Sequence, residues 1–531
     1  MKIEQWQNSD YLSMENGIFE IRGAAGAGKT HQLVKDIHFL YDNNHSNIAV
    51  LSFSNAAVDE LSGRLVDLNV TPSTLHSFCW KVIGTVSKHI LDSIDLLSKF
   101  KPEGLQKSHN CTLKDVKTVQ YGEIGIPQFN PSTGELWLSH DDVISLFIEA
   151  LEWIPNFKKM ISGSFDYILI DEYQDTNGDF LNMLFKKLSK LLTIGLYGDP
   201  FQTVYLNDKT INIASEKQKY GIKTFNLPYN YRSQANLVNL YNQTRERYDG
   251  LEQKPKNNVG SMPQVFLHSG SITLELVSLI NRQMNFESSV ILSTTNRMRV
   301  SAAGFGPIAA KIYGWIPTPK HGYTDWSEVL HKDRLSPYVT ALIEYGNLLF
   351  GSDYSSVCAL LTLFTKKSVQ NVDINSIKEL LHQEKEKQIV TVEGYEELGL
   401  QFTNEINNDF TNKLNLFTFS ELKKVVDLYN LLDDINDQSM TFFSSKGLEF
   451  NNVILNIDFG NYWKFNWNKI DFNHSENDKI DLRSDIMLYL FYVGITRAKH
   501  GLAIFVNTDV HSKFENNLKN KFPRLLKYKN I

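Results

Sequence analysis

The N-terminal part of the chain alternates short apolar runs with stretches of helical periodicity. The run Gly17–Ile21 precedes a glycine-rich turn and a helical stretch, and the run Ile48–Leu51 precedes another helical stretch. A short apolar run bounded by turns predicts a buried strand, and strands that alternate with helices are typical of a parallel sheet. A further apolar run at 167–170 continues the pattern. We therefore predict a parallel α/β sheet built from residues 1–80 and 165–225.

The C-terminal half repeats this pattern around a second interruption. Apolar runs predict the strands of a second sheet at 265–268, 290–293, 453–457 and 502–506. Helical periodicity dominates the stretches between them at 338–350, 374–387 and 419–432. We therefore predict a second α/β sheet from residues 226–304 and 439–531, with an insert at 305–438. The first sheet has its own insert at 81–164, which includes a turn-rich piece at 127–131. Both inserts are predicted to be mainly helical.

Composition narrows the class of protein without naming a ligand. The 531 residues are 42% hydrophobic and 21% charged, which excludes a disordered or fibrous chain. No run approaches the roughly 18 apolar residues of a membrane helix, so we expect a cytoplasmic protein. Cys79, Cys111 and Cys358 are too scattered for a disulfide framework or a closed zinc site. A net charge of -6 means that any nucleic-acid contact must come from a local groove.

The glycine-rich turn after the first predicted strand carries a nucleotide-binding motif. Residues 23–30 read GAAGAGKT, which fits G-x-x-x-x-G-K-[ST] between a strand and a helix. Glycines let backbone amides approach phosphate oxygens, and the helix N-terminus adds partial positive charge. We expect Lys29 to bind the β and γ phosphates and Thr30 to bind Mg²⁺. A chance glycine turn is the alternative, and the flanking strand and helix argue against it.

Two acidic residues follow a later strand. Asp171 and Glu172 stand at the carboxyl end of the apolar run 165–170, the edge where ligands bind in such sheets. Phosphate-ester hydrolysis needs one carboxylate near the metal and another as base for the attacking water. We assign the first role to Asp171 and the second to Glu172. An acidic strand cap in solvent is the alternative, which the neighbouring P-loop disfavours.

Further short motifs follow in a fixed order along the chain. They are Phe53–Ala57 with Arg64, Thr74–Cys79, Asp171–Thr176, Gly198–Asp199 with Gln202 and Tyr205, Tyr229–Ser233, Ser445–Phe450, and Tyr492–Lys499. In this order they resemble the motifs of superfamily 1 DNA helicases of the UvrD, Rep and PcrA type. The resemblance covers nearly the whole chain. It implies a P-loop NTPase with two RecA-like parallel-sheet motor domains, 1A and 2A, whose inserts are 1B and 2B, and it implies ATP and Mg²⁺ as cofactors.

The resemblance also implies roles for individual residues. Gln202 would sense the γ-phosphate and Tyr231 would stack on adenine, while Arg232 and Arg497 would reach the γ-phosphate from the second α/β region. The implied catalytic residues are Lys29, Glu172, Gln202, Arg232 and Arg497. The implied ATP contacts are Gly23, Ala24, Ala25, Gly26, Ala27, Gly28, Lys29, Thr30, His31, Gln7, Tyr231, Gly447 and Glu449. For the adenine-reading glutamine, Gln5 fits nearly as well as Gln7.

Single-stranded DNA is the implied track. Its implied contacts are Phe53, Asn55, Arg64, His76, Phe78, Tyr205 and Ser445, with a core role as the alternative for Phe78. The chain departs from the family because Asn207 and Asp208 replace a DNA-stacking tryptophan and its arginine. Ala56, Phe443 and His31 likewise replace a lysine, a histidine and an arginine. Stacking on an aromatic side chain contributes roughly 1–3 kcal/mol per base, so we expect these changes to weaken the binding of DNA.

We therefore expect an ATP-dependent translocase or helicase that moves 3′ to 5′ on single-stranded or tailed duplex DNA, in anti-phage defence or in DNA repair. The stretch 168–175 and the overall length also resemble the helicase subunits of Gabija anti-phage systems, which implies an OLD-family, Gabija A-like nuclease as partner. One alternative is a DNA-sensing regulatory subunit of a nuclease complex that unwinds little, motivated by Asn207 and Asp208. A second alternative is a small-molecule kinase that shares only the P-loop, but this hypothesis does not explain the motifs that contain Arg232 and Arg497.

Overall fold

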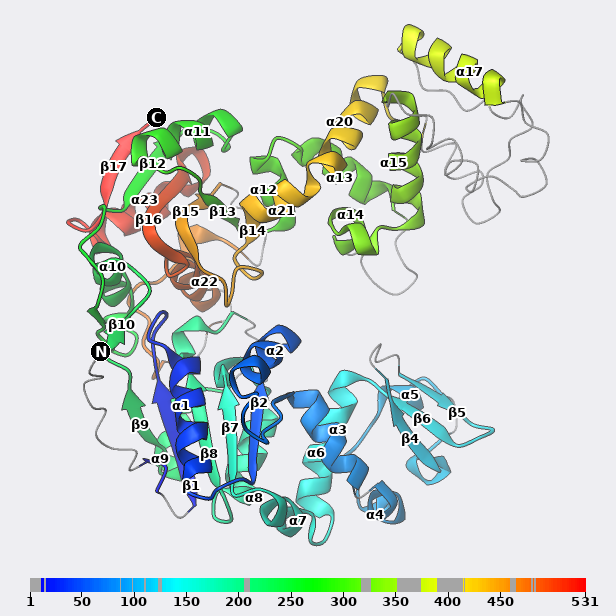
Figure 1. Ribbon diagram of the computed structural model, residues 1–531, viewed down its shortest axis with the longest axis vertical. Helices are drawn as coiled ribbons and strands as arrows, with labels where there is room; N and C mark the ends of the chain where they lie inside the picture. Colours follow the sequence, from blue (N-terminus) through cyan, green and yellow to red (C-terminus); the bar gives the residue numbers. More distant parts are fainter. Residues whose placement is uncertain are drawn as a thin grey trace. The chain divides into compact units, whose positions relative to one another are not determined.

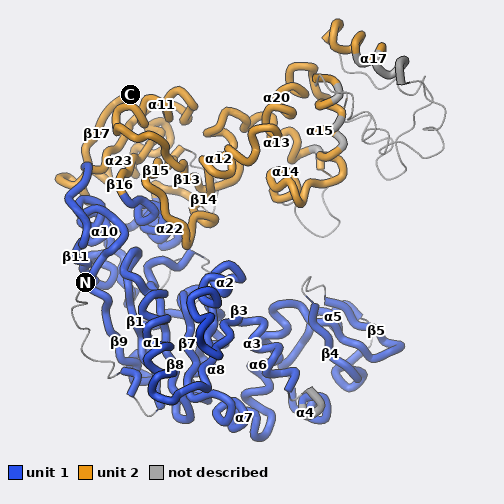
Figure 2. The backbone as a smooth tube through the Cα atoms, in the orientation of Figure 1, with its two compact units in different colours: residues 1–261, 469–499 blue, residues 262–468, 500–531 orange. Residues whose placement is uncertain are grey.

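The computed structural model describes most of the chain. The described residues are 11–13, 16–85, 87–97, 99–108, 111–122, 127–204, 211–316, 326–350, 374–388, 414, 416–458, 465–478, 481 and 484–531. Two compact units are distinguished by their internal packing (Figure 2). Unit 1 comprises residues 1–261 and 469–499, and unit 2 comprises residues 262–468 and 500–531.

A six-stranded sheet forms the centre of unit 1 (Figure 1). Its order is β3-β2-β7-β8-β1-β9, and all neighbouring strands run parallel. The strands are β1 (Gly17–Arg22), β2 (Ile48–Ser52), β3 (Ser73–Thr74), β7 (Tyr167–Asp171), β8 (Thr193–Gly198) and β9 (Lys223–Asn226). Every residue of β2, β7 and β8 is buried, as expected for a parallel sheet covered on both faces. Because the strands are parallel, the turns that follow β1, β7 and β8 meet at one edge.

The helices of unit 1 follow the predicted strand-helix alternation. They include α1 (Lys29–Asp42), α2 (Asn55–Arg64), α8 (Gly178–Leu188), α10 (Ala235–Arg245) and α22 (Asp485–Ile495). All eleven residues of α22 are buried, because this helix packs inside unit 1 rather than along its surface. The predicted α/β class with parallel sheets is confirmed.

The first insert is less helical than predicted. It contains α3 (Leu75–Thr85), which begins before it, and α6 (His140–Trp153), but also a three-stranded sheet of β4 (Thr118–Tyr121), β5 (Gln128–Asn130) and β6 (Glu135–Leu138). The turn-rich piece at 127–131 contains β5, which pairs antiparallel with β6. Only one of its three residues, Phe129, is buried. Their burial alternates, but strands of three or four residues are too short for that alternation to identify them in a sequence.

Unit 2 contains the second sheet, in the order β14-β13-β15-β16-β12-β17. Its strands are β12 (Gln264–His268), β13 (Val290–Ser293), β14 (Ser439–Thr441), β15 (Phe450–Ile457), β16 (Ala498–Asn507) and β17 (Lys527–Asn530). The second insert is helical where it is described, with α13 (Gly306–Trp315), α15 (Pro337–Phe350), α17 (Ile374–Lys387), α20 (Phe419–Asn430) and α21 (Leu432–Gln438). Within the described ranges, each helix is too short or too polar to cross a membrane.

The packing groups two segments differently from the predicted domains. Residues 226–261 and 469–499 were assigned to the second α/β region, but they pack in unit 1. Buried polar contacts give a physical reason: Arg22 of β1 pairs with Asp249 at 3.4 Å and with Glu476 at 2.5 Å. The four-domain division from the sequence stays a prediction.

Candidate nucleotide site

The P-loop has the geometry of a phosphate cradle. It runs from the end of β1 to Lys29, the first residue of α1, and no side chain caps the N-terminus of that helix. Gly26 and Gly28 have φ of 77° and 80°, a left-handed conformation that favours glycine. A Cβ on Gly26 would lie 2.8 Å from the Cβ of Arg232. The uncapped amides of α1 fit phosphate oxygens, and the loop fits no bulkier residue at Gly26.

Asp171 lies beside the P-loop at the end of β7. Its Oδ2 accepts a hydrogen bond from the Thr30 hydroxyl at 3.3 Å, and its Oδ1 accepts one from the Glu172 amide at 3.1 Å. Burial, followed by repulsion from Glu172, raises the pKa of Asp171 to about 7. A hydroxyl and a buried carboxylate in contact are ligands that suit Mg²⁺. The predicted metal pair is therefore brought together.

Glu172 stands in a strained backbone position. Its φ is 49°, in the left-handed region that a residue with a side chain adopts at a cost of about 1–3 kcal/mol. Its carboxylate lies 3.7 Å from the Lys29 ammonium and also accepts a hydrogen bond from the Gln174 amide. The side-chain Oε1 of Gln174 in turn accepts a hydrogen bond from the backbone amide of Asp199 at 3.1 Å. In this conformation the predicted base lies beside the P-loop lysine.

Gln202 and Arg497 are in direct contact. The Gln202 amide donates to Asp199 Oδ2 at 2.7 Å, and its Oε1 accepts a bond from Arg497 Nη2 at 3.1 Å. Both side chains are buried. Burial, followed by repulsion from Arg232, lowers the pKa of Arg497 to about 9. The predicted γ-phosphate sensor and one predicted arginine therefore form one buried unit.

The segment that carries Arg232 is bonded directly to the P-loop. The Tyr231 amide donates to the Gly26 carbonyl at 2.9 Å, and the Asn230 side chain donates to the Ala25 carbonyl at 2.9 Å. Arg232 Nη1 donates to the Thr496 carbonyl at 3.3 Å, and Tyr231 is 56% exposed. We expected both arginines to belong to the second α/β region, but their packing places them in unit 1.

Other predicted ATP contacts, where they are described, are divided between the two units. His31 is exposed on α1. Gly447, with φ of 83°, and the exposed Glu449 belong to unit 2. Gln7 lies outside the described residues. Their roles stay predictions.

Three predicted DNA contacts are accessible at the surface of unit 1. Phe53 is 47% exposed at the end of β2, and Asn55 and Arg64 are exposed at the two ends of α2. Arg64 makes an exposed ion pair with Glu60, at 2.6 Å, which binding to a phosphate could replace. Tyr205 lies outside the described residues, as do Asn207 and Asp208.

Two predicted DNA contacts are buried, which disfavours a direct contact with DNA. Phe78 is 4% exposed and packs on Phe147 and Phe165, so its ring belongs to the hydrophobic core of unit 1. Ser445 is fully buried and donates to the Phe442 carbonyl at 2.8 Å. His76 is intermediate: it is half-buried and its ring lies 5.0 Å from that of His140. A spacing match identifies the position in the chain, whereas packing decides whether the side chain reaches the surface.

Sequence reasoning missed a buried arginine next to the sensor. Arg245 is fully buried and bonds both Asp199 carboxylate oxygens, at 3.0 and 3.2 Å. It belongs to no recognised motif. One signal was available: in α10, Arg245 follows the buried residues Leu237 and Tyr241 at four-residue spacing, so a charge lies on the apolar face. Such a charge must have a buried partner.

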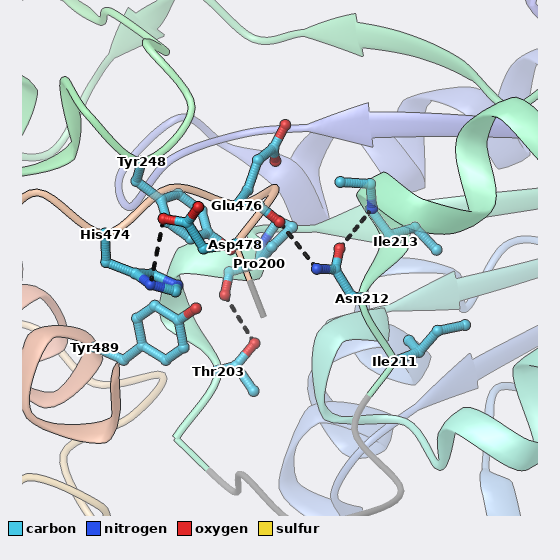
Figure 3. A pocket seen from close by; sticks show the side chains of 11 residues that line it. Pro200, Thr203, Ile211, Asn212, Ile213, Tyr248, His474, Glu476, Asp478 and Tyr489 are labelled. Atoms are coloured by element: carbon cyan, nitrogen blue, oxygen red, sulfur yellow. Dashed lines mark hydrogen bonds and ion pairs between the residues drawn. The ribbon is translucent and has the colours of Figure 1, made fainter. Parts of the chain in front are cut away.

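A small pocket opens in unit 1 beside the sensor (Figure 3). Pro200 and Thr203 line it from the turn that carries Gln202, and Asn212, His474 and Glu476 line it from other segments. The Asn212 side chain donates to the Glu476 carbonyl at 2.9 Å. The pocket therefore lies where the segment 469–499 meets the rest of unit 1.

Two family models match separate parts of this chain. Residues 8–208 match the family model of an AAA domain, and residues 325–509 match that of the UvrD-like helicase C-terminal domain. The resemblance to UvrD/PcrA-type helicases that the motif order predicts is confirmed.

Individual relatives agree with these matches. The ATP-dependent DNA helicase PcrA of Staphylococcus epidermidis is 26% identical over 298 residues, which cover 47% of this chain and 40% of that protein. PcrA of Bacillus subtilis is 23% identical over 291 residues, covering 46% and 39%. The Gabija protein GajB of Bacillus cereus is 23% identical over 481 residues, covering 76% of this chain and 67% of that protein. The matched region thus spans about two fifths of the PcrA relatives' length.

Proposed function

We propose that the protein hydrolyses ATP to move 3′ to 5′ along single-stranded DNA and to unwind duplexes. The supporting observation is the continuous set of contacts from Lys29 through Glu172 and Gln174 to Asp199, Gln202 and Arg497. This set joins the phosphate-binding lysine, the candidate base and the candidate sensor within one unit. The PcrA relatives are named ATP-dependent DNA helicases.

In the proposed mechanism the P-loop amides and Lys29 bind the β and γ phosphates, and Thr30 and Asp171 would hold Mg²⁺. When bound, the metal neutralises charge on the phosphate oxygens. Glu172 orients a water and takes its proton as the water oxygen bonds to the γ-phosphorus. The bond from that phosphorus to the bridging oxygen breaks, and ADP and phosphate leave. Arg497 and Arg232 stabilise the charge on the transferring group.

The contact between Gln202 and Arg497 offers a route from hydrolysis to movement. Both groups would bind the γ-phosphate, so its loss would release interactions that only the ATP state makes. A ligand shifts a conformational equilibrium only through such a difference in interactions. The exposed Phe53 and Arg64 lie on the same unit as candidate DNA contacts.

Two measurements on the purified chain test the proposal. Steady-state ATPase rates are measured with and without single-stranded DNA, and strand displacement is measured on duplexes with 3′ or 5′ tails. We expect DNA to stimulate ATPase activity and the 3′-tailed duplex to unwind preferentially. DNA-stimulated ATPase without unwinding would support the sensor alternative instead. ATPase indifferent to DNA would overturn the proposal and favour the small-molecule kinase.

We also propose a role in anti-phage defence with a nuclease partner of the OLD family. The support is the extent of the GajB alignment, which covers 76% of this chain against 47% for PcrA of S. epidermidis. Phage plaque counts on cells that express the chain with its neighbouring genes test the role, with Lys29→Ala as the inactive control. Equal plaque counts for the active and inactive chains would favour DNA repair.

A further inference from the structure

The guanidinium of Arg245 is fully bonded inside unit 1. Nη1 and Nη2 donate to the two Asp199 oxygens at 3.2 and 3.0 Å, and Nη1 also donates to the Tyr492 hydroxyl at 2.8 Å. Nε and Nη2 donate to the Asp249 carboxylate at 3.0 and 2.6 Å. These five bonds use every N–H group of the side chain. The planar fork therefore fixes Asp199 in both position and rotation.

Asp199 in turn decides which way the Gln202 amide faces. Its Oδ2 accepts the Gln202 Nε2–H at 2.7 Å, and its Oδ1 accepts the Phe201 amide at 3.2 Å. A carboxylate only accepts hydrogen bonds, so the nitrogen end of the Gln202 amide must face Asp199. The oxygen end must then face Arg497, where it accepts a bond at 3.1 Å.

We propose that Arg245 is a positioning residue for ATP turnover, which acts through Asp199 on Gln202 and Arg497. The inference rests on the proposed hydrolytic function and assigns a role to a residue outside every recognised motif. Without the guanidinium, the buried Asp199 would lose its closest counter-charge and its fixed rotation. The Gln202 amide would then lose the constraint that turns its oxygen toward Arg497.

A purely stabilising role explains the arrangement less well. A buried ion pair is weak evidence for stability, because a well-packed apolar replacement is often as stable. Yet α10 holds a fully bonded guanidinium on its apolar face, directly behind the sensor turn. Asp249 also pairs with Arg22, the last residue of β1 before the P-loop. The Arg245 guanidinium therefore bonds the aspartate of the sensor turn directly, whereas Asp249 contacts Arg245 and Arg22.

The first test replaces Arg245 by lysine, which keeps the charge but cannot form the two parallel bonds to Asp199. We expect kcat for ATP to fall by about tenfold to a hundredfold, since small displacements of groups near the reaction have effects of this size. Binding of fluorescent ADP should stay within about twofold of wild type, because ADP lacks the γ-phosphate. Unchanged kcat in a folded variant would overturn the proposal.

A double-mutant cycle separates positioning from general damage. If Arg245 acts through Gln202, Arg245→Lys should lower kcat by less than about twofold in a Gln202→Ala background. An equal loss in both backgrounds would show that Arg245 acts elsewhere and would overturn the proposal. Single-turnover rates make the slow variants measurable.

Asp249→Asn is the matched control. It removes a carboxylate from the same guanidinium but leaves the Arg245–Asp199 bonds, so the midpoint of thermal unfolding should fall while kcat stays within about twofold. A loss of kcat equal to that of Arg245→Lys would assign the effect to the whole cluster and contradict the proposal.

If Arg245→Lys fails to fold, Arg245→Met with Asp249→Asn removes the charge together with one partner, and the same criteria apply. A wild-type chain that hydrolyses no ATP would instead refute the proposed function.

Discussion

Asp171 is deeply buried, and its proposed role in binding Mg²⁺ needs a negative charge. The proximity of Thr30 to Asp171 could be predicted from the sequence, because phosphate and metal chemistry fixes residue types at a fixed spacing. Arg245 and Phe78 could not be assigned in this way. The first depends on partners far along the chain, and the second depends on whether its helix turns it toward the core.

The residues proposed to bind the γ-phosphate and to act as base should give different defects when they are replaced. Lys29→Ala removes a transition-state donor, so kcat should fall by about 100-fold or more and ATP should bind more weakly. Glu172→Gln removes only the base, so ATP should still bind while turnover falls by about 10²–10⁴-fold. Nucleotide binding by fluorescence and steady-state hydrolysis measure the two effects. Wild-type turnover by Glu172→Gln would exclude Glu172 as the base.

The raised pKa of Asp171 predicts a dependence of stability on pH. Its pKa in the folded protein, about 7, lies above that of an unfolded aspartate, so the folded state holds the proton more tightly. This stabilisation is complete below about pH 4 and is lost as the pH rises through 7. Asp171→Asn should therefore raise the free energy of unfolding at pH 8 by about 1–4 kcal/mol, and by much less at pH 4. Urea unfolding without Mg²⁺ measures the free energy at both pH values, and equal effects at pH 4 and pH 8 would contradict the raised pKa of Asp171.

At the scale of elements, long apolar runs predicted strands correctly, whereas the short strands were missed. The strands β1, β7 and β8, which carry the site, could be predicted because a strand that is buried along its length has a continuous run of apolar residues. The three-residue β5 and the exposed-edge β17 carry no such run, so neither was predicted. The turns between elements, where the site lies, were recognisable only through their glycines and acids.

The P-loop turn itself can be tested with one methyl group. Gly26→Ala places a Cβ within 3 Å of Arg232 and Asn230 at a φ of 77°. A left-handed alanine costs about 1–2 kcal/mol, and the contacts add to this, so ATP affinity should fall by about tenfold or more. Gly63→Ala in α2 is the control, because its Cβ meets nothing within 4 Å. The control should be neutral or stabilise by up to about 1 kcal/mol. Equal nucleotide affinities for the two variants would refute the assigned loop geometry.

At the scale of the whole molecule, the motif order predicted two parallel sheets with inserts, but not how the segments group. Hydrophobic periodicity reports which residues are buried, whereas the partner that buries them is set by contacts between distant segments. The ion pairs of Arg22 with Asp249 and Glu476 are such contacts, and no local sequence pattern predicts them.

The grouping predicts which parts lose structure together. In native-state hydrogen exchange with added denaturant, amides of α22 should lose protection with those of β8, because both belong to unit 1. Amides of β13 and β15 should follow a separate transition. Exchange of α22 together with β13 and β15 would instead support the predicted domain boundaries.

The chain passes between the two units at 261–262, 468–469 and 499–500. A protease cut at any one of these points therefore leaves the units covalently joined, and only cuts at all three separate them. For the same reason neither unit can be expressed alone as one continuous stretch of the gene. Unit 1 could be isolated only by joining residue 261 to residue 469 with a designed linker, which would retain every residue of the contact set from Lys29 to Arg497.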